Sequence, residues 1–113
     1  AIYVADFLIE NGAKICVYDP KVTEQQMLLD LDYLNSRSSQ ENKKKLSYYS
    51  DPLKACENSH AVAIITEWEE FKHYDWYKIY DCVMSPAKVF DGRNILNKVA
   101  LEEIGFEVFS IGK

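Results

Sequence analysis

The sequence has few cysteines and histidines, and their spacing provides no disulfide or metal pattern. The three cysteines are odd in number and form no C-x-x-C pair, which argues against a disulfide framework and against a zinc site. Neither His60 nor His73 has neighbours at a spacing that would make it a convincing metal ligand, so both are predicted to be ordinary surface or strand-entry residues. Cys16 and Cys56 lie in apolar patterns that favour inert burial, and Cys82 follows an aspartate. We therefore expect reduced thiols, no metal and no cysteine nucleophile.

The sequence also lacks an excess of positive charge and any long apolar run. Lys and Arg number 13 against 18 Asp and Glu, a net charge of -5 that excludes the footprint of a general nucleic-acid or membrane-surface binder. The run Lys43-Lys44-Lys45 lies in a polar stretch and is interpreted as solvated. No apolar run approaches the roughly 20 residues of a membrane span, and the sequence does not begin with a signal-peptide pattern. We expect a soluble, cytoplasmic protein with no nucleic-acid or membrane partner.

What the sequence does contain is enough apolar residues for a core, arranged in alternating strand and helix patterns. Its 113 residues, 48% of them hydrophobic, suit one globular domain. Strands are predicted at residues 13–18, 46–49, 61–65, 87–90 and 106–111, and helices up to residue 11 and at 23–31, 52–56, 75–83 and 95–104. This alternation predicts an α/β fold, a Rossmann-like doubly wound parallel sheet with helices on both faces.

Three features of this pattern predict how the domain is organised. The uninterrupted apolar residues 61–65 predict a central strand covered on both faces. The polar stretch 32–45 predicts an exposed insertion. The chain begins on a helical pattern without a methionine, so we expect it to be a fragment whose first strand, central in the sheet, lies upstream of Ala1.

The predicted strand at 87–90 ends in a glycine turn that presents an arginine. Asp91-Gly92 supplies a tight turn, and Arg93 follows it. The carboxyl ends of parallel strands are where α/β proteins bind ligands, and a guanidinium can hold phosphate oxygens through two parallel charge-assisted hydrogen bonds. Arg93 is therefore a candidate phosphate ligand, with an ordinary exposed loop arginine as the alternative.

Two other segments follow predicted strands. Thr66-Glu67-Trp68 comes after the predicted central strand and opens onto the carboxyl edge, where Thr66 can donate a hydrogen bond and Trp68 can stack on a base or pack against a neighbouring domain. Thr66 and Trp68 are candidates for the rim of a site. Asp19 stands where dinucleotide-binding folds place a ribose-binding acid, but its G-x-G-x-x-G partner would lie before Ala1, and Asp-Pro is common in plain turns. Asp19 is therefore left out of the site.

Four segments, in this order and spacing, carry a resemblance to a known family: VYDPKV at 17–22, AVAIITEWEEF at 61–71, KVFDGRNIL at 88–96 and IGFEVFSIGK at 104–113. Over essentially its whole length, the chain resembles the C-terminal UDP-binding domain of the UDP-glucose/GDP-mannose dehydrogenase family, in its eukaryotic UDP-glucose-oxidising form. The resemblance implies that the full protein oxidises UDP-glucose to UDP-glucuronate with two NAD. It also implies a cytosolic enzyme whose partners are UDP-glucose, the remaining domains of the same protein and further copies of itself.

The resemblance also assigns roles to residues of this chain. It matches Arg93 to the arginine that contacts the UDP-sugar, with Phe90, Asp91 and Gly92 as its scaffold. The family's catalytic cysteine matches none of the three cysteines here, so the resemblance implies no catalytic residue in this chain. NAD is expected to be bound mainly by a domain that this chain does not contain. The fragment alone is therefore expected to bind the UDP-sugar without catalysing its oxidation.

Two functions of other classes are the alternatives. A receiver-like signalling domain fits the five-unit α/β pattern, but it needs an acidic pair after its first strand and a phosphoacceptor aspartate after its third. The only nearby aspartate, Asp51, is predicted to cap a helix. A structural oligomerisation domain fits the 8 tyrosines and 2 tryptophans, because such residues are enriched at interface hot spots.

Overall fold

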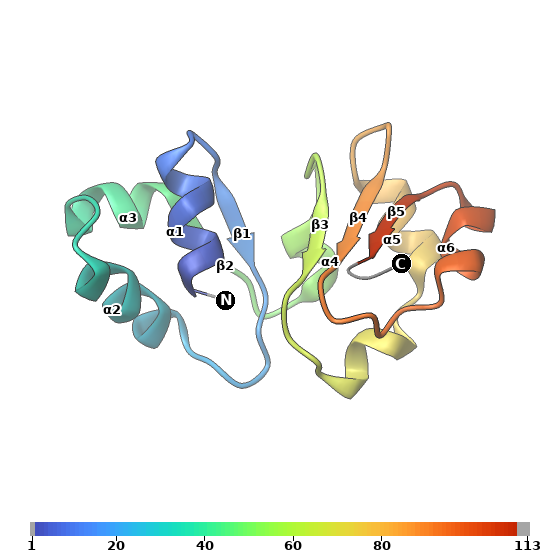
Figure 1. The fold of residues 1–113 in the computed structure, drawn as a ribbon, viewed down its shortest axis with the longest axis horizontal. Coiled ribbons are helices and arrows are strands. Elements are labelled where there is room, and N and C mark those ends of the chain that lie inside the picture. Colours follow the sequence, from blue (N-terminus) through green and yellow to red (C-terminus); the bar gives the residue numbers. More distant parts are fainter. Residues whose placement is uncertain (1, 111–113) are drawn as a thin grey trace. The chain divides into compact units, whose positions relative to one another are not determined.

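The computed structural model describes residues 2–110 and shows an α/β protein whose described strands all pair in parallel (Figure 1). The strands form two sheets, β1-β2 and β3-β4-β5, rather than the one sheet predicted, and the chain divides after Ala55 into two compact units. The α/β, Rossmann-like fold class is confirmed. None of the helices in the described range is long and apolar enough to cross a membrane. The elements in chain order are α1 (Ile2–Glu10), β1 (Ile15–Val17), α2 (Glu24–Leu34), α3 (Ser39–Lys45), β2 (Leu46–Tyr48), α4 (Pro52–Cys56), β3 (Val62–Ile64), the 3-10 helix η1 (Glu69–His73), α5 (Trp76–Cys82), β4 (Lys88–Asp91), α6 (Lys98–Ile104) and β5 (Glu107–Ser110).

Each predicted strand and helix has a counterpart in the structure, whereas α3 and η1 were not predicted. The last predicted strand is observed over Glu107–Ser110, and Ile111 lies outside the described residues. Gly105 ends α6 as predicted, because its φ of 131° is a left-handed conformation that favours glycine. A Cβ at Gly105 would also come within 2.7 Å of the Tyr80 hydroxyl oxygen.

The first unit packs its helices on the two-stranded sheet β1-β2. Its buried core joins Ile9 of α1, Leu31 of α2 and Leu46 of β2. Helix α2 begins at the predicted cap, where the Thr23 hydroxyl accepts a hydrogen bond of 3.2 Å from the backbone N–H of Gln26. Local capping and apolar spacing therefore place this helix as the sequence predicts.

The segment 32–45 is not simply an exposed insertion. Its second half forms α3, which begins where the Ser38 hydroxyl accepts a hydrogen bond of 3.2 Å from the backbone N–H of Glu41. The side chain of Asn42 lies within this helix and is completely buried. The prediction of exposure is therefore wrong at Asn42, because polar side chains can be buried when they satisfy one another's hydrogen bonds.

A buried arginine organises this polar cluster. The Arg37 side chain is 7% exposed, and its Nη1 lies 3.0 Å from Oδ1 of Asp6, while its Nη2 lies 2.8 Å from Oε2 of Glu10. Nη1 also donates to Oδ1 of Asn42, whose Nδ2 donates to Oδ1 of Asp32, both at 2.8 Å. Burial lowers the pKa of Arg37, but hydrogen bonds with the two acids and their charges hold it above its ordinary value. The cluster therefore ties α1 to α2 and α3 through a charged guanidinium.

The second unit contains the sheet order β3-β4-β5, in which β4 lies in the middle. Val89 pairs with Val62 on one side and Val108 on the other, and Ile64 pairs with Asp91. The prediction that residues 61–65 form the central strand is wrong for this sheet. A run of apolar residues shows that a strand is partly buried, but strand order depends on which neighbours pair with it.

The core of the second unit lies between one face of this sheet and helices α5 and α6. Val89 is completely buried, and Leu101 of α6 is 3% exposed. Trp76 of α5 and Phe106 meet edge to face, with ring centroids 5.8 Å apart. Asp75 caps α5 as predicted, because its side chain accepts from the backbone N–H groups of the first turn. This packing anchors the strands whose carboxyl ends carry the candidate site.

Candidate functional site at the carboxyl ends of β3 and β4

A buried aspartate shapes the turn that follows β4. Asp91 is 1% exposed; its Oδ1 accepts a hydrogen bond of 3.2 Å from the Arg93 N–H, and its Oδ2 accepts one of 2.8 Å from the Leu96 N–H. The Gly92 N–H donates to the carbonyl of Ile64 at 2.9 Å and so ties the turn to β3. The predicted role of Asp-Gly as the support for Arg93 has a clear physical basis, because the backbone of the turn is held at three points.

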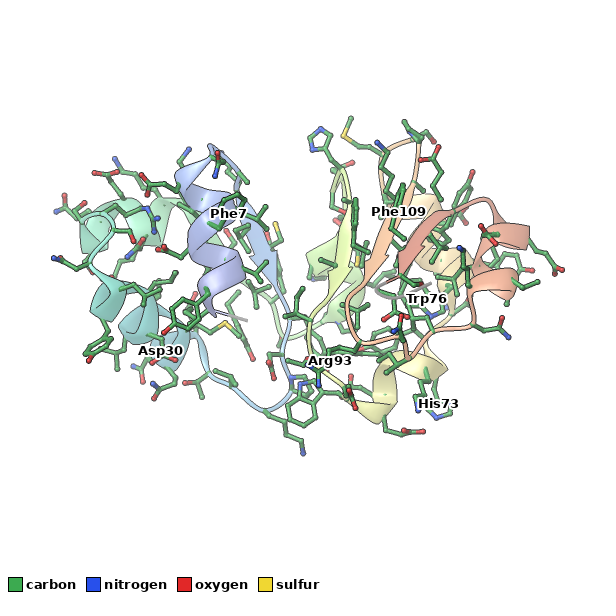
Figure 2. The ribbon with its side chains drawn as sticks, viewed as in Figure 1. Phe7, Asp30, His73, Trp76, Arg93 and Phe109 are labelled. Carbon is green, nitrogen blue, oxygen red and sulfur yellow. The ribbon has the colours of Figure 1, made fainter. Side chains whose placement is uncertain are left out.

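Arg93 projects from this turn and meets a carboxylate from the neighbouring strand end (Figure 2). Its Nε and Nη2 lie 3.1 and 2.9 Å from the same oxygen, Oε1 of Glu67. The side chains of Arg93 and Glu67 are 49% and 56% exposed, so the pair is open to solvent. An exposed ion pair of this kind contributes only about 0–1 kcal/mol to stability. Nη1 has no protein partner among the described residues.

The pairing brings together two segments that were predicted to share one edge of the sheet. Glu67 follows β3 and Arg93 follows β4, and these two strands are hydrogen-bonded neighbours. The prediction identified Thr66 and Trp68 as rim residues and assigned no role to Glu67. The signal that could have identified Glu67 is an acidic residue after one strand and a basic residue after the next. Neighbouring parallel strands end side by side, so such residues can meet.

Thr66 and Trp68 are both partly buried, on either side of Glu67. Trp68 precedes η1, and its carbonyl accepts a hydrogen bond of 3.1 Å from the Phe71 N–H. Phe71 is buried, and its ring lies 5.7 Å from that of Tyr74. These contacts place Trp68 at the start of a packed aromatic segment, and the side chain that meets Arg93 comes from Glu67.

Phe90 faces away from the turn that it was expected to support. Its ring stacks on Phe109 with centroids 4.9 Å apart and an interplanar angle of 15°, and it is 44% exposed. Successive side chains of a strand point to opposite faces, so Phe90 and the buried Asp91 lie on different sides of the sheet. Ala63, its partner on β3, is exposed as well. The expected cover on both faces is therefore incomplete here, and the Phe90 ring packs on Phe109 on the face of the sheet opposite to Asp91.

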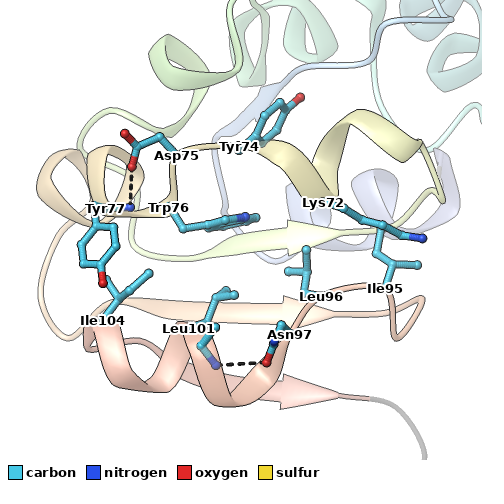
Figure 3. A pocket seen from close by; sticks show the side chains of 11 residues that line it. Lys72, Tyr74, Asp75, Trp76, Tyr77, Ile95, Leu96, Asn97, Leu101 and Ile104 are labelled. Carbon is cyan, nitrogen blue, oxygen red and sulfur yellow. Dashed lines mark hydrogen bonds between the residues drawn. The ribbon is translucent and has the colours of Figure 1, made fainter.

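A pocket of about 440 Å³ lies near this turn in the second unit (Figure 3). Two of its polar side chains cap helices: Asp75 accepts from the Tyr77 N–H, and Asn97 accepts from the Ala100 N–H. None of the predicted site residues lines the pocket. Its lining consists of Lys72, Tyr74, Asp75, Trp76, Tyr77, Ile95, Leu96, Asn97, Ala100, Leu101 and Ile104.

The Asp19 side chain forms a local turn after β1. It is 8% exposed, and its Oδ1 accepts a hydrogen bond of 2.8 Å from the Lys21 N–H. The carbonyl of Asp19 accepts a further bond of 3.0 Å from the Tyr48 hydroxyl. The side chain therefore satisfies the local backbone, which accounts for a buried carboxylate at this position.

One cysteine, Cys16, is not buried as predicted. Cys16 is exposed, because it alternates along β1 with Ile15 and Val17, which pack against the core. Cys56 and Cys82 are partly buried. Burial, together with the negative charges of neighbouring acids, raises the pKa of Cys82 and so disfavours its thiolate.

A parallel α/β fold that presents an arginine on a glycine turn at the carboxyl edge of its sheet defines a ligand-binding α/β domain suited to an anion. The sequence pattern described as "UDP-glucose/GDP-mannose dehydrogenase family, UDP binding domain" matches residues 1–98. The chain belongs to this family.

The relatives that this chain matches are dehydrogenases, and the chain covers only part of the length of each. A UDP-glucose 6-dehydrogenase from Drosophila melanogaster is 45% identical over 100% of this chain and 24% of its own length. One from Caenorhabditis elegans is 44% identical over 99% of this chain and 23% of its own length. UDP-glucose 6-dehydrogenase 4 from Arabidopsis thaliana is 43% identical over 100% of this chain and 25% of its own length. The chain thus spans about a quarter of these relatives.

Proposed function

We propose that this chain is the UDP-sugar-binding domain of a UDP-glucose 6-dehydrogenase and that Arg93 contacts the diphosphate of the ligand. The observation that carries the proposal is the Asp91-supported turn, which presents a half-exposed guanidinium at the carboxyl edge of a parallel sheet. A guanidinium matches phosphate oxygens through paired, charge-assisted hydrogen bonds. The family to which the chain belongs and the names of its relatives agree with this ligand.

The full protein oxidises UDP-glucose to UDP-glucuronate with two NAD, and this chain contributes binding rather than chemistry. The residues present do not fit a dinucleotide site: the 4 glycines form no G-x-G-x-x-G turn, and the Asp19 carboxylate is engaged by the Lys21 N–H. NAD therefore belongs to other parts of the enzyme. A cytoplasmic location and assembly of several copies complete the proposal, as the resemblance implies.

The receiver-like alternative is wrong. Family membership contradicts it, and Asp51 accepts a hydrogen bond of 3.0 Å from the Leu53 N–H at the start of α4. A phosphoacceptor carboxylate has to be open to a phosphodonor, whereas this one caps a helix.

Steady-state kinetics of the full-length protein with Arg93→Ala tests the proposal. Loss of a charge-assisted contact should cost about 1.5–3 kcal/mol, so the KM for UDP-glucose should rise roughly tenfold to a hundredfold while the KM for NAD stays close to its original value. Lys78→Ala, which removes an exposed positive charge from α5, is the matched control and should leave both constants unchanged. An unchanged KM for UDP-glucose in Arg93→Ala would refute the assignment.

A further inference from the structure

We propose that Glu67 is the positioning residue of Arg93, holding one edge of the guanidinium so that the other edge is presented to the diphosphate. This inference rests on the proposed function, because it concerns how the same arginine meets the same ligand. Glu67 uses a single oxygen, Oε1, for both Nε at 3.1 Å and Nη2 at 2.9 Å. The Nη1 side of the guanidinium then remains available to form a fork with an anion.

The backbones that carry the two side chains are held in place. Ile64 pairs with Asp91, and the Gly92 N–H donates to the Ile64 carbonyl at 2.9 Å, so the ends of β3 and β4 are joined just before Glu67 and Arg93. The conformational freedom that remains is that of the Glu67 and Arg93 side chains, which are both about half exposed. A long arginine side chain in water samples many rotamers, and ordering it on ligand binding costs conformational free energy. An acid that already holds the guanidinium reduces that cost.

Neighbouring acids are engaged elsewhere, which makes the contact specific to Glu67. Oε2 of Glu69 lies 3.3 Å from the Lys72 ammonium, and its Oε1 lies 3.5 Å from Nε2 of His73. The hydrogen bond and charge of Lys72, with a smaller contribution from His73, lower the pKa of Glu69. Glu70 accepts a hydrogen bond of 2.6 Å from the Tyr74 hydroxyl. Of the three acids in this stretch, Glu67 is the one that meets Arg93.

The two ways in which an acid can act on this arginine predict opposite results. If Glu67 positions Arg93, its removal should weaken UDP binding. If Glu67 instead competes with the phosphates for the guanidinium, its removal should tighten binding, because a nearby negative charge that repels the ligand is lost. The positioning role also predicts rescue by glutamine, because the amide oxygen of Glu67→Gln can still accept from Nε and Nη2.

The test is equilibrium titration of the full-length protein with UDP, using Glu67→Ala, Glu67→Gln and the control Glu69→Ala. We expect Glu67→Ala to raise the Kd about two- to tenfold, the range that corresponds to ordering one long side chain. Glu67→Gln should restore most of the affinity. Glu69→Ala, which removes the same charge two positions along the chain, should bind UDP as tightly as the original protein. An unchanged or lower Kd in Glu67→Ala would overturn the proposal.

The same titration in an Arg93→Ala background separates this inference from the function on which it rests. If Glu67 acts through Arg93, Glu67→Ala should have no additional effect there. A weakened Arg93→Ala protein together with an unaffected Glu67→Ala protein would retain the function and reject the positioning role. An unaffected Arg93→Ala protein would reject the contact between Arg93 and the ligand itself.

Discussion

At the scale of single residues, the turn that carries Arg93 depends on a buried carboxylate. Asp91 is buried at the end of β4 and accepts from the N–H groups of Arg93 and Leu96. Deleting its side chain leaves two backbone donors without their acceptor in a partly buried turn. Each such loss costs about 1–3 kcal/mol, more than an exposed ion pair contributes. The Asp91 carboxylate therefore fixes the backbone of the turn from which the Arg93 side chain extends.

We expect Asp91→Ala to lower the melting temperature of the full-length protein and to raise the KM for UDP-glucose. Asp91→Asn should have a smaller effect, because its amide oxygen can still accept one of the two hydrogen bonds. Thermal denaturation and steady-state kinetics measure the two effects. A variant that melts and binds like the original protein would show that the turn does not need this carboxylate.

The residue scale also shows what could be predicted from the sequence. Arg93, Gly92 and Asp91 form a local pattern, so the turn and its arginine could be identified without a structure. The contact with Glu67 is not part of this local pattern. An acid after one strand and a base after the next identifies it only if β3 and β4 are neighbours in the register that pairs Ile64 with Asp91. The burial of Asn42 depends in the same way on partners that are distant in sequence.

At the scale of elements, the helices with local start and stop signals were predicted best. Thr23, Asp75 and Gly105 mark helix ends through short-range hydrogen bonds or backbone conformation, and all three act as predicted. Helix α3 was missed although Ser38 and Glu41 have the spacing of a capping box. Helix α3 has a polar composition without an apolar stripe, because it packs through a buried charge network, and so its sequence resembles that of an exposed loop.

The stability of helix α3 depends on the charge network around Arg37. We expect Arg37→Ala to destabilise the α1-α2-α3 cluster by about 1–3 kcal/mol, because Asn42 and Asp6 would lose their buried partner. Hydrogen exchange of the full-length protein should show faster exchange in α3, and Lys44→Ala on the same helix should leave it unchanged. Equal protection of α3 in Arg37→Ala would contradict this role.

The same cluster should respond to acid. Hydrogen bonds from Asn42 and Ser39, opposed in part by burial and aided by the charge of Lys43, hold the pKa of Asp32 below its ordinary value. A carboxylate with a lowered folded-state pKa stabilises the fold above its unfolded pKa, and this contribution is lost as the pH falls through the folded pKa. Protection factors in α3 should therefore fall at acidic pH. In Asp32→Asn this dependence should be flatter, and an identical acid response in both proteins would exclude Asp32 as its source.

At the scale of the whole molecule, the chain spans about a quarter of the length of its relatives. The α/β class and the family could be predicted from strand-helix alternation and the four motifs, because both follow from patterns along the sequence. The division into two sheets and the exposed Phe90–Phe109 face could not be predicted, because they depend on strand pairing and packing in three dimensions.

The most direct test of this account is the affinity of the full-length protein for UDP, measured by calorimetric titration with and without Arg93→Ala. UDP carries the diphosphate but lacks the glucose that the proposed reaction oxidises, so its binding does not depend on the dehydrogenase reaction. The account predicts a roughly tenfold to hundredfold higher Kd for Arg93→Ala, with the melting temperature close to that of the original protein. An unchanged Kd for UDP in a folded Arg93→Ala protein would contradict it.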